Sequence, residues 1–418
     1  MDEWETKAKY NIAETCCDSI SVDQLQEFSD QKDAPENAKS ILPSSKRMGY
    51  GEIRGSKELR QNLANLYSSK VGTPLPIDNI LITQGAIAAN ILVFYALIQP
   101  GDHVIVHYPT YQQLYAVPAS LGASVSLWHA RPEKDWIPDL DELKALVTEK
   151  TKMIVINNPN NPTGAILPKA LLQSIVSLAA DHAITVLSDE VYRPIFHSTT
   201  PLDASFPPSL LSLGAANTLA TGSLSKAYAL AGIRVGWVAS RSAALTERIY
   251  AARHYTTLSV SQLDSAVAAF ALSPAVVHRL LARNIALAKA NLRVLERFVV
   301  KHDDVVEWVR PVAGTTAFLR FHRGGRPVDD LVLCTRLVQE TGVLWCPGRH
   351  CFGRDRDFAG FVRVGFCCAE EVLKEGLEKV RLWMRKEFDD LPLAENAEGT
   401  DGEAERVLEV SEHVRQVD

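Results

Sequence analysis

The sequence predicts an α/β protein in which a large domain, with a mostly parallel sheet between helices, is joined to a smaller α+β domain. Two observations support this prediction. Short runs rich in valine and isoleucine are apolar on both faces, as expected of parallel strands that helices cover on both sides. Segments of helical length separate these runs, and alternation of strands and helices is typical of an α/β domain. The 418 residues suffice for two or three domain-sized units.

The elements of the large domain are expected in a regular order. The strand runs are NILIT, HVIVH, KMIVIN, ITVLSD, NTLAT and VGWVAS, which end at residues 83, 107, 157, 189, 221 and 240. Helices are expected at 86–98, 140–148 and 168–182, and a long helical stretch follows at 273–302. The apolar stretch at 86–98 is interrupted by Asn90 and is too short to span a bilayer, so we expect a buried helix there.

The pattern changes after the long helix. The runs TTAFLRF and FVRVGF predict separate strands, and an amphipathic helix is expected at 369–386. These elements suit a smaller α+β domain, which the N-terminal residues join because they precede the first strand of the large sheet. Four parts are therefore expected: an N-terminal segment at 1–46 that belongs to the small domain, the large domain at 47–295, the C-terminal small domain at 296–388, and a disordered acidic tail at 389–418.

The charge pattern argues against a nucleic-acid partner. The formal net charge is −6, and residues 387–418 alone hold eleven acidic and two basic side chains. No block of basic residues stands out, although such blocks are typical of proteins that bind nucleic acids. The polar N-terminus MDEWETKAKY lacks the layout of a signal peptide. We therefore expect a cytoplasmic protein with neither nucleic-acid nor membrane partners.

The cysteines indicate free thiols. There are seven of them, an odd number, and no two have the spacing of a CxxC motif. This usage is typical of a reducing compartment. Cys346, His350 and Cys351 are close in sequence, but their spacing matches no zinc pattern, so no metal site is expected.

Polar residues gather where the predicted strands end, which is where open parallel sheets bind ligands. These residues are Gly85–Ile87, Tyr108–Tyr111, Asn157–Gly164, Ser188–Tyr192 and Ser223–Lys226. In the segment SLSKAYALAGIRVGW, Lys226 and Arg234 stand in a small and apolar setting. Because a buried charge needs a partner, either both cations are solvated on a surface turn or an anionic, electrophilic group belongs beside them.

Three motifs in this order carry a resemblance to a known family. NNPNNPTG follows one strand, SDEVY closes another, and Lys226 comes after a third. Together they resemble the pyridoxal-phosphate enzymes of fold type I, the class I/II aminotransferase superfamily, over residues 11–385. The resemblance implies pyridoxal 5′-phosphate as the cofactor and amino acids and keto acids as substrates.

The resemblance also implies roles around the cofactor ring. Lys226 would form the Schiff base and, once released, move the proton of the substrate Cα atom. Asp189 would keep the ring nitrogen protonated, so that the ring acts as an electron sink. Asn161 and Tyr192 would donate hydrogen bonds to the ring hydroxyl, and Tyr111 would stack on the ring.

The phosphate would lie where the strand run ending at Thr83 gives way to a helix. Backbone amides at a helix start bind phosphate, and here they belong to Gly85, Ala86 and Ile87. Ser223 and Arg234 would complete this phosphate site, since arginine can pair with phosphate bidentately.

Two further residues follow from the resemblance. In YGEIRGSKELR, Tyr50 would reach the phosphate of the other subunit, which implies a homodimer with shared active sites. In FVRVGF, Arg363 would bind the α-carboxylate of the substrate, beside Asn161.

Each of these residues also has an ordinary structural interpretation. Asp189 could cap a helix and Asn161 could occupy a turn. Arg234 and Arg363 could form surface ion pairs, and the two tyrosines could be packing residues. The order of the motifs favours the cofactor site, and the presence of the lysine, the aspartate and both arginines disfavours a non-catalytic regulator of the same fold.

Two reaction classes remain open. The first is an aminotransferase acting on a small amino acid. The second is a lyase or synthase of the elimination–cyclisation type, because NIAETCCDSISVDQL and ARHYTTLSVSQLD resemble segments of aminocyclopropane-carboxylate synthases, and the overall pattern resembles capreomycidine synthase. In the second class Glu14 would lie near the substrate side chain and could accept a cationic group, or it could be an exposed carboxylate at a turn. Arg253 could bind a second carboxylate or be structural.

Overall fold

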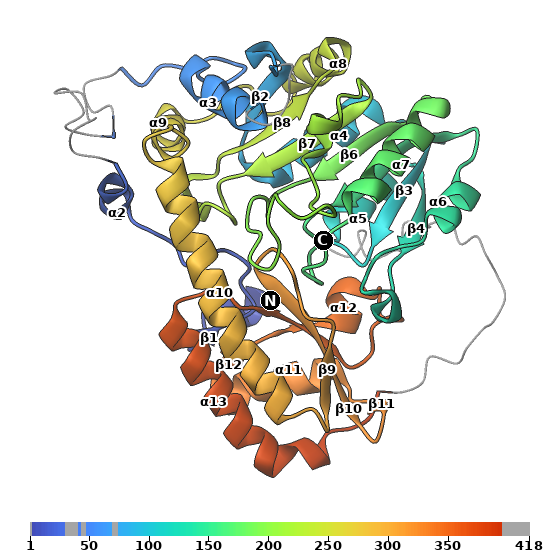
Figure 1. The fold of residues 1–418 in the computed structure, drawn as a ribbon, viewed down its shortest axis with the longest axis vertical. Helices are drawn as coiled ribbons and strands as arrows, with labels where there is room; N and C mark the ends of the chain where they lie inside the picture. Colours follow the sequence, from blue (N-terminus) through green and yellow to red (C-terminus); the bar gives the residue numbers. More distant parts are fainter. Residues whose placement is uncertain (1, 30–40, 43–46, 69–73, 395–418) are drawn as a thin grey trace, which may run out of the picture.

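The computed structural model describes residues 2–29, 41–42, 47–68 and 74–394. Within residues 74–394, seven strands form one large sheet in the order β2-β8-β7-β6-β5-β3-β4 (Figure 1). The strands are β2 (Ile80–Thr83), β3 (His103–Tyr108), β4 (Ser124–His129), β5 (Thr151–Asn157), β6 (Thr185–Asp189), β7 (Thr218–Ser223) and β8 (Gly236–Ser240). All neighbouring strands run parallel except β8, which is antiparallel to both β7 and β2. The predicted mostly parallel sheet is therefore confirmed.

One strand of this sheet was not expected from the sequence. The strand β4 lies at the sheet edge beside β3, and only Val125 and Trp128 of its residues are fully buried. A half-exposed edge strand lacks the continuous apolar run that marks a strand covered on both faces. The six predicted strand runs, in contrast, coincide with β2, β3, β5, β6, β7 and β8.

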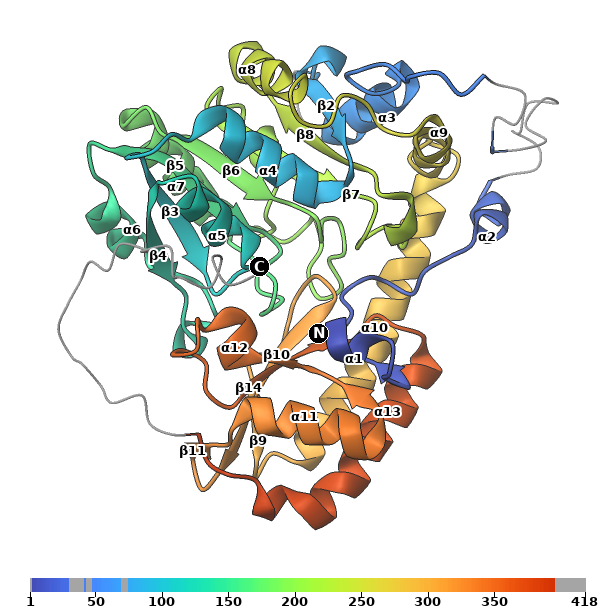
Figure 2. The same cartoon turned by 180° about the vertical axis from the view of Figure 1, so that it is seen from behind.

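Helices cover both faces of the large sheet. One face packs against α4 (Gly85–Leu97), α5 (Gln113–Ser120) and α8 (Ala243–Arg253), which lie in front in Figure 2. The opposite face packs against α3 (Lys57–Ser68), α6 (Leu140–Leu146), α7 (Lys169–Asp181) and α9 (Gln262–Ala271). The helix α4, which was expected to be buried, is buried on the face that packs on the sheet, while Ile87, Ile91 and Tyr95 on its other face are exposed.

A smaller sheet lies below the large one in Figure 1. It has the order β11-β10-β14-β13, with β9 also paired to β10, and all pairs are antiparallel. Its strands are β9 (Val306–Trp308), β10 (Thr316–Arg323), β11 (Arg326–Pro327), β13 (Cys346–Pro347) and β14 (Phe361–Gly365). The accompanying helices are α11 (Asp330–Thr341), α12 (Gly348–Phe352) and α13 (Glu370–Glu387).

One long helix runs between the two sheets. The helix α10 (Val277–Lys301) extends from the large unit down to the small one in both views (Figures 1 and 2). The predicted domain boundary at residue 295 falls inside this helix, near its C-terminal end. Its buried apolar side chains belong to a hydrophobic cluster that includes residues of both units, so the two units share one core.

The N-terminal segment connects the small unit to the large one. It begins with α1 (Asp2–Glu5), and β1 (Tyr10–Asn11) then pairs in parallel with β12 (Val343–Leu344). Further along, the backbone amide of Cys17 donates to the carbonyl of Lys226 at 3.1 Å. The helix α2 (Val22–Glu27) follows. Residues 12–17 therefore run from the small sheet to the loop that follows β7.

Two sequence predictions lie partly or wholly outside the described residues. The predicted disordered tail at 389–418 falls largely beyond residue 394, and much of the predicted N-terminal segment falls at 30–40 and 43–46. Among the residues that the structure describes, no helix combines the length and the apolar character needed to cross a membrane.

Candidate active site

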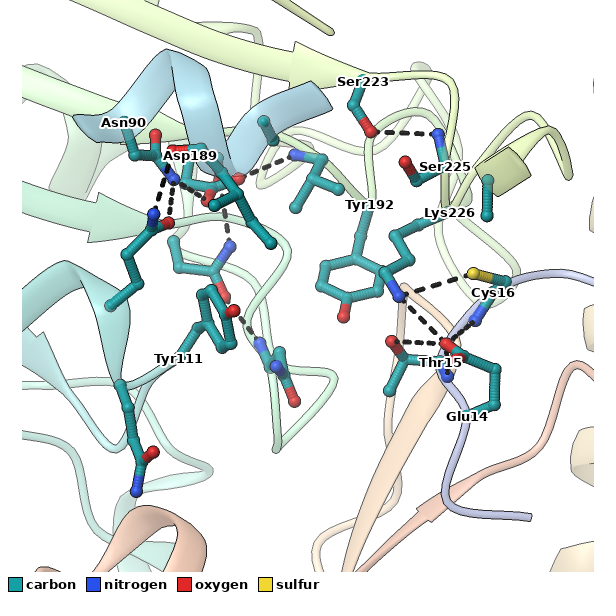
Figure 3. A pocket seen from close by; sticks show the side chains of 18 of the residues that line it. Glu14, Thr15, Cys16, Asn90, Tyr111, Asp189, Tyr192, Ser223, Ser225 and Lys226 are labelled. Atoms are coloured by element: carbon teal, nitrogen blue, oxygen red, sulfur yellow. Dashed lines mark hydrogen bonds and ion pairs between the residues drawn. The ribbon is translucent and has the colours of Figure 1, made fainter. Parts of the chain in front are cut away.

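A cavity of about 430 Å³ lies where the strands of the large sheet end and the small unit begins. Its walls come from three parts of the chain: the strand ends of the large sheet, the small sheet with α12, and the N-terminal segment (Figure 3). The structure brings most of the predicted site residues to it, namely Glu14, Ala86, Ile87, Tyr111, Asn161, Asp189, Tyr192, Ser223, Lys226, Arg234 and Arg363. Gly85 lies directly before Ala86 as the first residue of α4.

Asp189, the last residue of β6, carries a buried carboxylate with two donors on the protein side. The side-chain amide of Asn90 donates to Oδ2 at 3.0 Å, and the backbone amide of Val191 donates to Oδ1 at 3.1 Å. Burial raises the pKa of Asp189 to about 6, because a charged carboxylate is poorly solvated there, although both donors act to lower it. A cation that reached this carboxylate from the cavity would favour its charged form.

The orientation of Asn90 is fixed by a second contact. The hydroxyl of Thr221 on β7 donates to Asn90 Oδ1 at 2.7 Å, so the Asn90 amide group must point its N–H bonds toward Asp189. Asn90 is almost fully buried within α4. Sequence reasoning noted this residue only as an interruption of an apolar run, yet a polar side chain in such a helix is itself a sign of a buried polar partner.

The loop after β5 is held against the end of β6. Asn157 accepts a hydrogen bond from the backbone amide of Asn161 at 2.7 Å and donates to the carbonyl of Asp189 at 3.0 Å. This brings Asn161 to the cavity, where its Oδ1 accepts from Arg363 at 3.2 Å. Tyr192 also lines the cavity, and burial raises the pKa of its hydroxyl.

Lys226 follows β7 and projects into the cavity toward the N-terminal segment (Figure 3). Its Nζ lies 3.0 Å from Glu14 Oε1 and 3.4 Å from Cys16 Sγ. Burial disfavours the charged amine, but the neighbouring Tyr192, Cys16 and Glu14 outweigh it, so the pKa of Lys226 is raised. Burial likewise opposes the charge on Glu14, but the ammonium group prevails and lowers the pKa of Glu14 to about 2.

Groups that suit an anion gather where α4 begins. Gly85 has φ +80°, and no side chain caps the first amides of the helix. A Cβ atom at Gly85 would lie 2.8 Å from the guanidinium of Arg234, and one at Gly236 would lie 2.4 Å from the backbone of Gly85. The guanidinium also donates to the Ser225 hydroxyl at 3.3 Å. Uncapped amides, hydroxyls and a cation together suit a phosphate group.

Arg363 lies on β14 and is buried on the small-unit side of the cavity. Its guanidinium donates to Asn161 Oδ1 at 3.2 Å and to the carbonyl of Ala13 at 2.8 Å, and both acceptors are neutral. Within the described residues, its Nε has no hydrogen-bond partner. A buried cation whose contacts are all neutral suits an anionic ligand.

Two predicted residues lie outside this cavity. Tyr50 is 87% exposed and lines a separate hollow with Met48 and residues 259–263. Arg253 is fully buried at the end of α8, where its Nε donates to the carbonyl of Leu258. In this chain, therefore, Arg253 does not face the cavity that Lys226 enters.

The thiols are free, as expected, and several of them line the cavity. All seven cysteines lie in the described residues and none forms a disulfide. Cys16, Cys346 and Cys351 line the cavity, although sequence reasoning gave them no role there. Within the described residues, no group of three His, Cys, Asp or Glu side chains could hold a metal ion.

Comparison with known proteins identifies the family. The model of the family "Aminotransferase class I and II" matches residues 22–380. The chain belongs to the class I and II aminotransferases. Enzymes of this family depend on pyridoxal phosphate, so the predicted family, fold and cofactor are confirmed, and the chain is a pyridoxal-phosphate-dependent aminotransferase.

Individual relatives of this aminotransferase span most of its length. A pyridoxal-phosphate-dependent aminotransferase from Streptococcus suis has a TM-score of 0.80 and 37% identity, over 92% of this chain and 96% of that one. Capreomycidine synthase of Streptomyces vinaceus is 34% identical over 73% of this chain and 75% of its own. Arginine–pyruvate transaminase of Pseudomonas aeruginosa is 29% identical over 80% of this aminotransferase and 81% of its own chain.

Proposed function

We propose that the cavity transfers an amino group between a small amino acid and a keto acid, with Lys226 as the reacting amine. One observation carries the proposal. The amine of Lys226, the buried carboxylate of Asp189, the groups that suit an anion at the start of α4 and the buried Arg363 all border one cavity. Bound pyridoxal phosphate would supply a carbonyl for an amine to attack and a ring that withdraws electrons from the substrate Cα atom.

The residues present fit this cofactor. The amides of Gly85, Ala86 and Ile87, with Ser223 and Arg234, would hold the phosphate, and Ser225 supports the arginine. Asp189 would pair with the ring nitrogen, while Asn90 and Val191 stabilise its charged form from behind. Asn161 and Tyr192 would face the ring hydroxyl, and Tyr111 would cover one face of the ring.

Lys226 and Arg363 would act on the substrate. Arg363 would bind the α-carboxylate, and its contact with Asn161 orients the guanidinium for that purpose. The Cα–H bond would then lie within reach of Nζ of Lys226, which takes the proton as a neutral amine. The loss of charge on Lys226 would leave Glu14 without the cation that it contacts in this structure.

The assembly that we propose is a homodimer with shared active sites. Tyr50 is highly exposed and lies apart from the cavity of its own chain, which suits a residue that reaches the cofactor phosphate of a partner subunit. The cytoplasmic location expected from the sequence stays a prediction.

A second reaction has a specific observation in its favour. The relative at 34% identity is a capreomycidine synthase, and a lyase or synthase could use the same residues to remove the Cα proton. The two reactions differ in whether an amino acceptor is needed.

The test is turnover with and without a keto acid. The purified enzyme, loaded with cofactor, is incubated with a panel of amino acids, and amino-acid loss is followed in the presence and absence of pyruvate or 2-oxoglutarate. Transamination predicts sustained loss only with the keto acid. Sustained loss without it would contradict transamination and support the lyase or synthase.

A further inference from the structure

The carboxylate of Glu14 borders a cavity whose other charges the proposed function already uses. Among the described residues, the charged side chains that line it are Glu14, Asp189, Lys226, Arg234 and Arg363. The proposed function, on which this inference rests, assigns the two arginines to the cofactor phosphate and the substrate α-carboxylate. It assigns Asp189 to the ring nitrogen and Lys226 to the reaction itself. Among these five charged side chains, Glu14 is the one to which the proposed function assigns no group of the cofactor or substrate.

The Glu14 carboxylate is held in place independently of Lys226. Its Oε1 accepts from the backbone amides of Thr15 at 2.5 Å and Cys16 at 3.1 Å. The surrounding segment is tied to the small sheet, because the amide of Gly365 donates to the carbonyl of Ile12 at 2.8 Å and the hydroxyl of Thr315 donates to the carbonyl of Thr15 at 2.6 Å. The carboxylate therefore keeps its position when the lysine reacts.

The reaction removes the cation that Glu14 contacts. The ion pair between Lys226 Nζ and Glu14 Oε1 spans 3.0 Å, and it requires a protonated lysine. An amine that is to accept a proton from Cα must first be neutral, and it carries the charge again only once it holds that proton. The Glu14 side chain is 45% exposed, so its carboxylate stays charged and partly solvated without the lysine, and a substrate that supplied a cation would gain a solvent-screened ion pair there.

The arginine proposed to bind the substrate carboxylate contacts the residue that precedes Glu14. The guanidinium of Arg363 donates to the carbonyl of Ala13 at 2.8 Å, and Ala13 directly precedes Glu14. We infer that the site selects amino acids with a basic side chain, whose ammonium or guanidinium group pairs with Glu14 while the α-carboxylate pairs with Arg363. For a second carboxylate the described lining offers no further cation, since both arginines are assigned and Arg253 is fully buried elsewhere.

The test compares basic amino acids with neutral ones of the same shape. We would measure kcat/KM of the cofactor-loaded enzyme for arginine against citrulline and for lysine against norleucine, with Glu14→Gln as the variant and Glu133→Gln, an exposed residue, as the control. The enzyme is expected to prefer the basic member of at least one pair. Because the Glu14 side chain is 45% exposed and solvent screens its charge, Glu14→Gln should reduce that preference about fivefold. Glu133→Gln should leave the preference where it is.

Dissociation constants from calorimetry should follow the same preference, which separates binding from catalysis. An equal fall for both members of the pair would mean that Glu14 acts on Lys226 rather than on the substrate, and would overturn the inference. A preference of the unmodified enzyme for aspartate or glutamate would overturn it as well. If no amino acid altered the visible absorbance of the bound cofactor, the proposed function itself would fail, and the inference with it.

Discussion

The two sides of the cavity are built differently. The sheet side consists of the buried residues Asp189, Asn90 and Ser223, which strand ends and α4 hold in place, and of the exposed Arg234 between β7 and β8. The small-unit side consists of Glu14 and Arg363 together with the thiols of Cys16, Cys346 and Cys351, and an irregular N-terminal segment supplies part of it. Lys226 projects from the sheet side toward the small-unit side (Figure 3).

The difference suggests that the sheet side binds the cofactor and the small-unit side binds the substrate. Backbone and side-chain hydrogen bonds fix the sheet side, as in the contact of Thr221 with Asn90 and of Asn90 with Asp189. A rigid, buried arrangement suits a cofactor that is the same in every turnover. The small-unit side contacts the part of the ligand that changes, so we expect substitutions there to alter substrate preference and KM, and substitutions on the sheet side to alter cofactor binding.

The largest effect is expected at Lys226, where the two sides meet. Lys226→Ala removes the reacting amine and should lower kcat by about 1,000-fold or more, since a general acid–base group contributes up to about four orders of magnitude. The measurement is initial rate on the best amino acid, with Lys144→Ala on the surface as a control that leaves the rate unchanged. Full activity of Lys226→Ala would contradict the assignment of the sheet side to the cofactor and of the small-unit side to the substrate.

A change on the small-unit side should act on KM. Arg363→Ala removes the buried guanidinium that is proposed to hold the α-carboxylate, and KM for amino acids should rise about 100-fold. Cofactor affinity, measured by absorbance titration, should change far less. A loss of cofactor affinity with an unchanged KM would contradict the assignment of substrate binding to the small-unit side.

On the sheet side, Asp189 predicts a pH-dependent stability. Burial raises its pKa from 3.8 to about 6, so the folded cofactor-free protein holds this proton more tightly than the unfolded chain. The stabilising effect is fully present below pH 3.8 and is lost as the pH rises through about 6. Between pH 4 and pH 7 the free energy of unfolding of Asp189→Asn should gain about 2–3 kcal/mol relative to the parent protein. The free energies of unfolding are measured by denaturant titration at each pH. If those of the variant and of the parent protein changed in parallel with pH, the account of a buried, ionising Asp189 would be contradicted.

The smallest effect is expected at Asn90, which acts through Asp189. Asn90→Leu keeps the side-chain size but removes the donor at 3.0 Å from the carboxylate, so the charged form of Asp189 loses support. We expect cofactor affinity to fall about tenfold, with the loss greatest near neutral pH and smaller at higher pH, where Asp189 ionises regardless. An affinity that fell by the same factor at every pH would indicate only a packing defect.

The sheet side was largely predictable from the sequence because its residues sit at fixed places after apolar strand runs. Asp189, Asn161 and Lys226 follow such runs, and parallel strands bring their carboxyl ends to one edge. Asn90 was not recognised, since its partner Asp189 lies 99 residues away and only the packing of α4 on β7, the neighbour of β6, brings them together.

The small-unit side was harder to predict. Nothing in the local sequence decides whether Glu14 is an exposed turn residue or a cavity residue, because the answer depends on the contacts of residues 12–17 with two distant parts of the chain. The thiols of Cys346 and Cys351 reach the cavity through β13 and α12, two short elements without a periodic signal. The role proposed for Tyr50 would require a second subunit, which a single chain does not contain.

The central claim is that Lys226 is the amine that bonds to the cofactor, and one measurement tests it directly. The protein is incubated with pyridoxal phosphate, reduced with borohydride, digested and mapped by mass spectrometry. The account predicts the phosphopyridoxyl mass on the peptide that contains Lys226 and its absence from other lysines at stoichiometric loading. Stoichiometric modification of another lysine, or none at all, would contradict it.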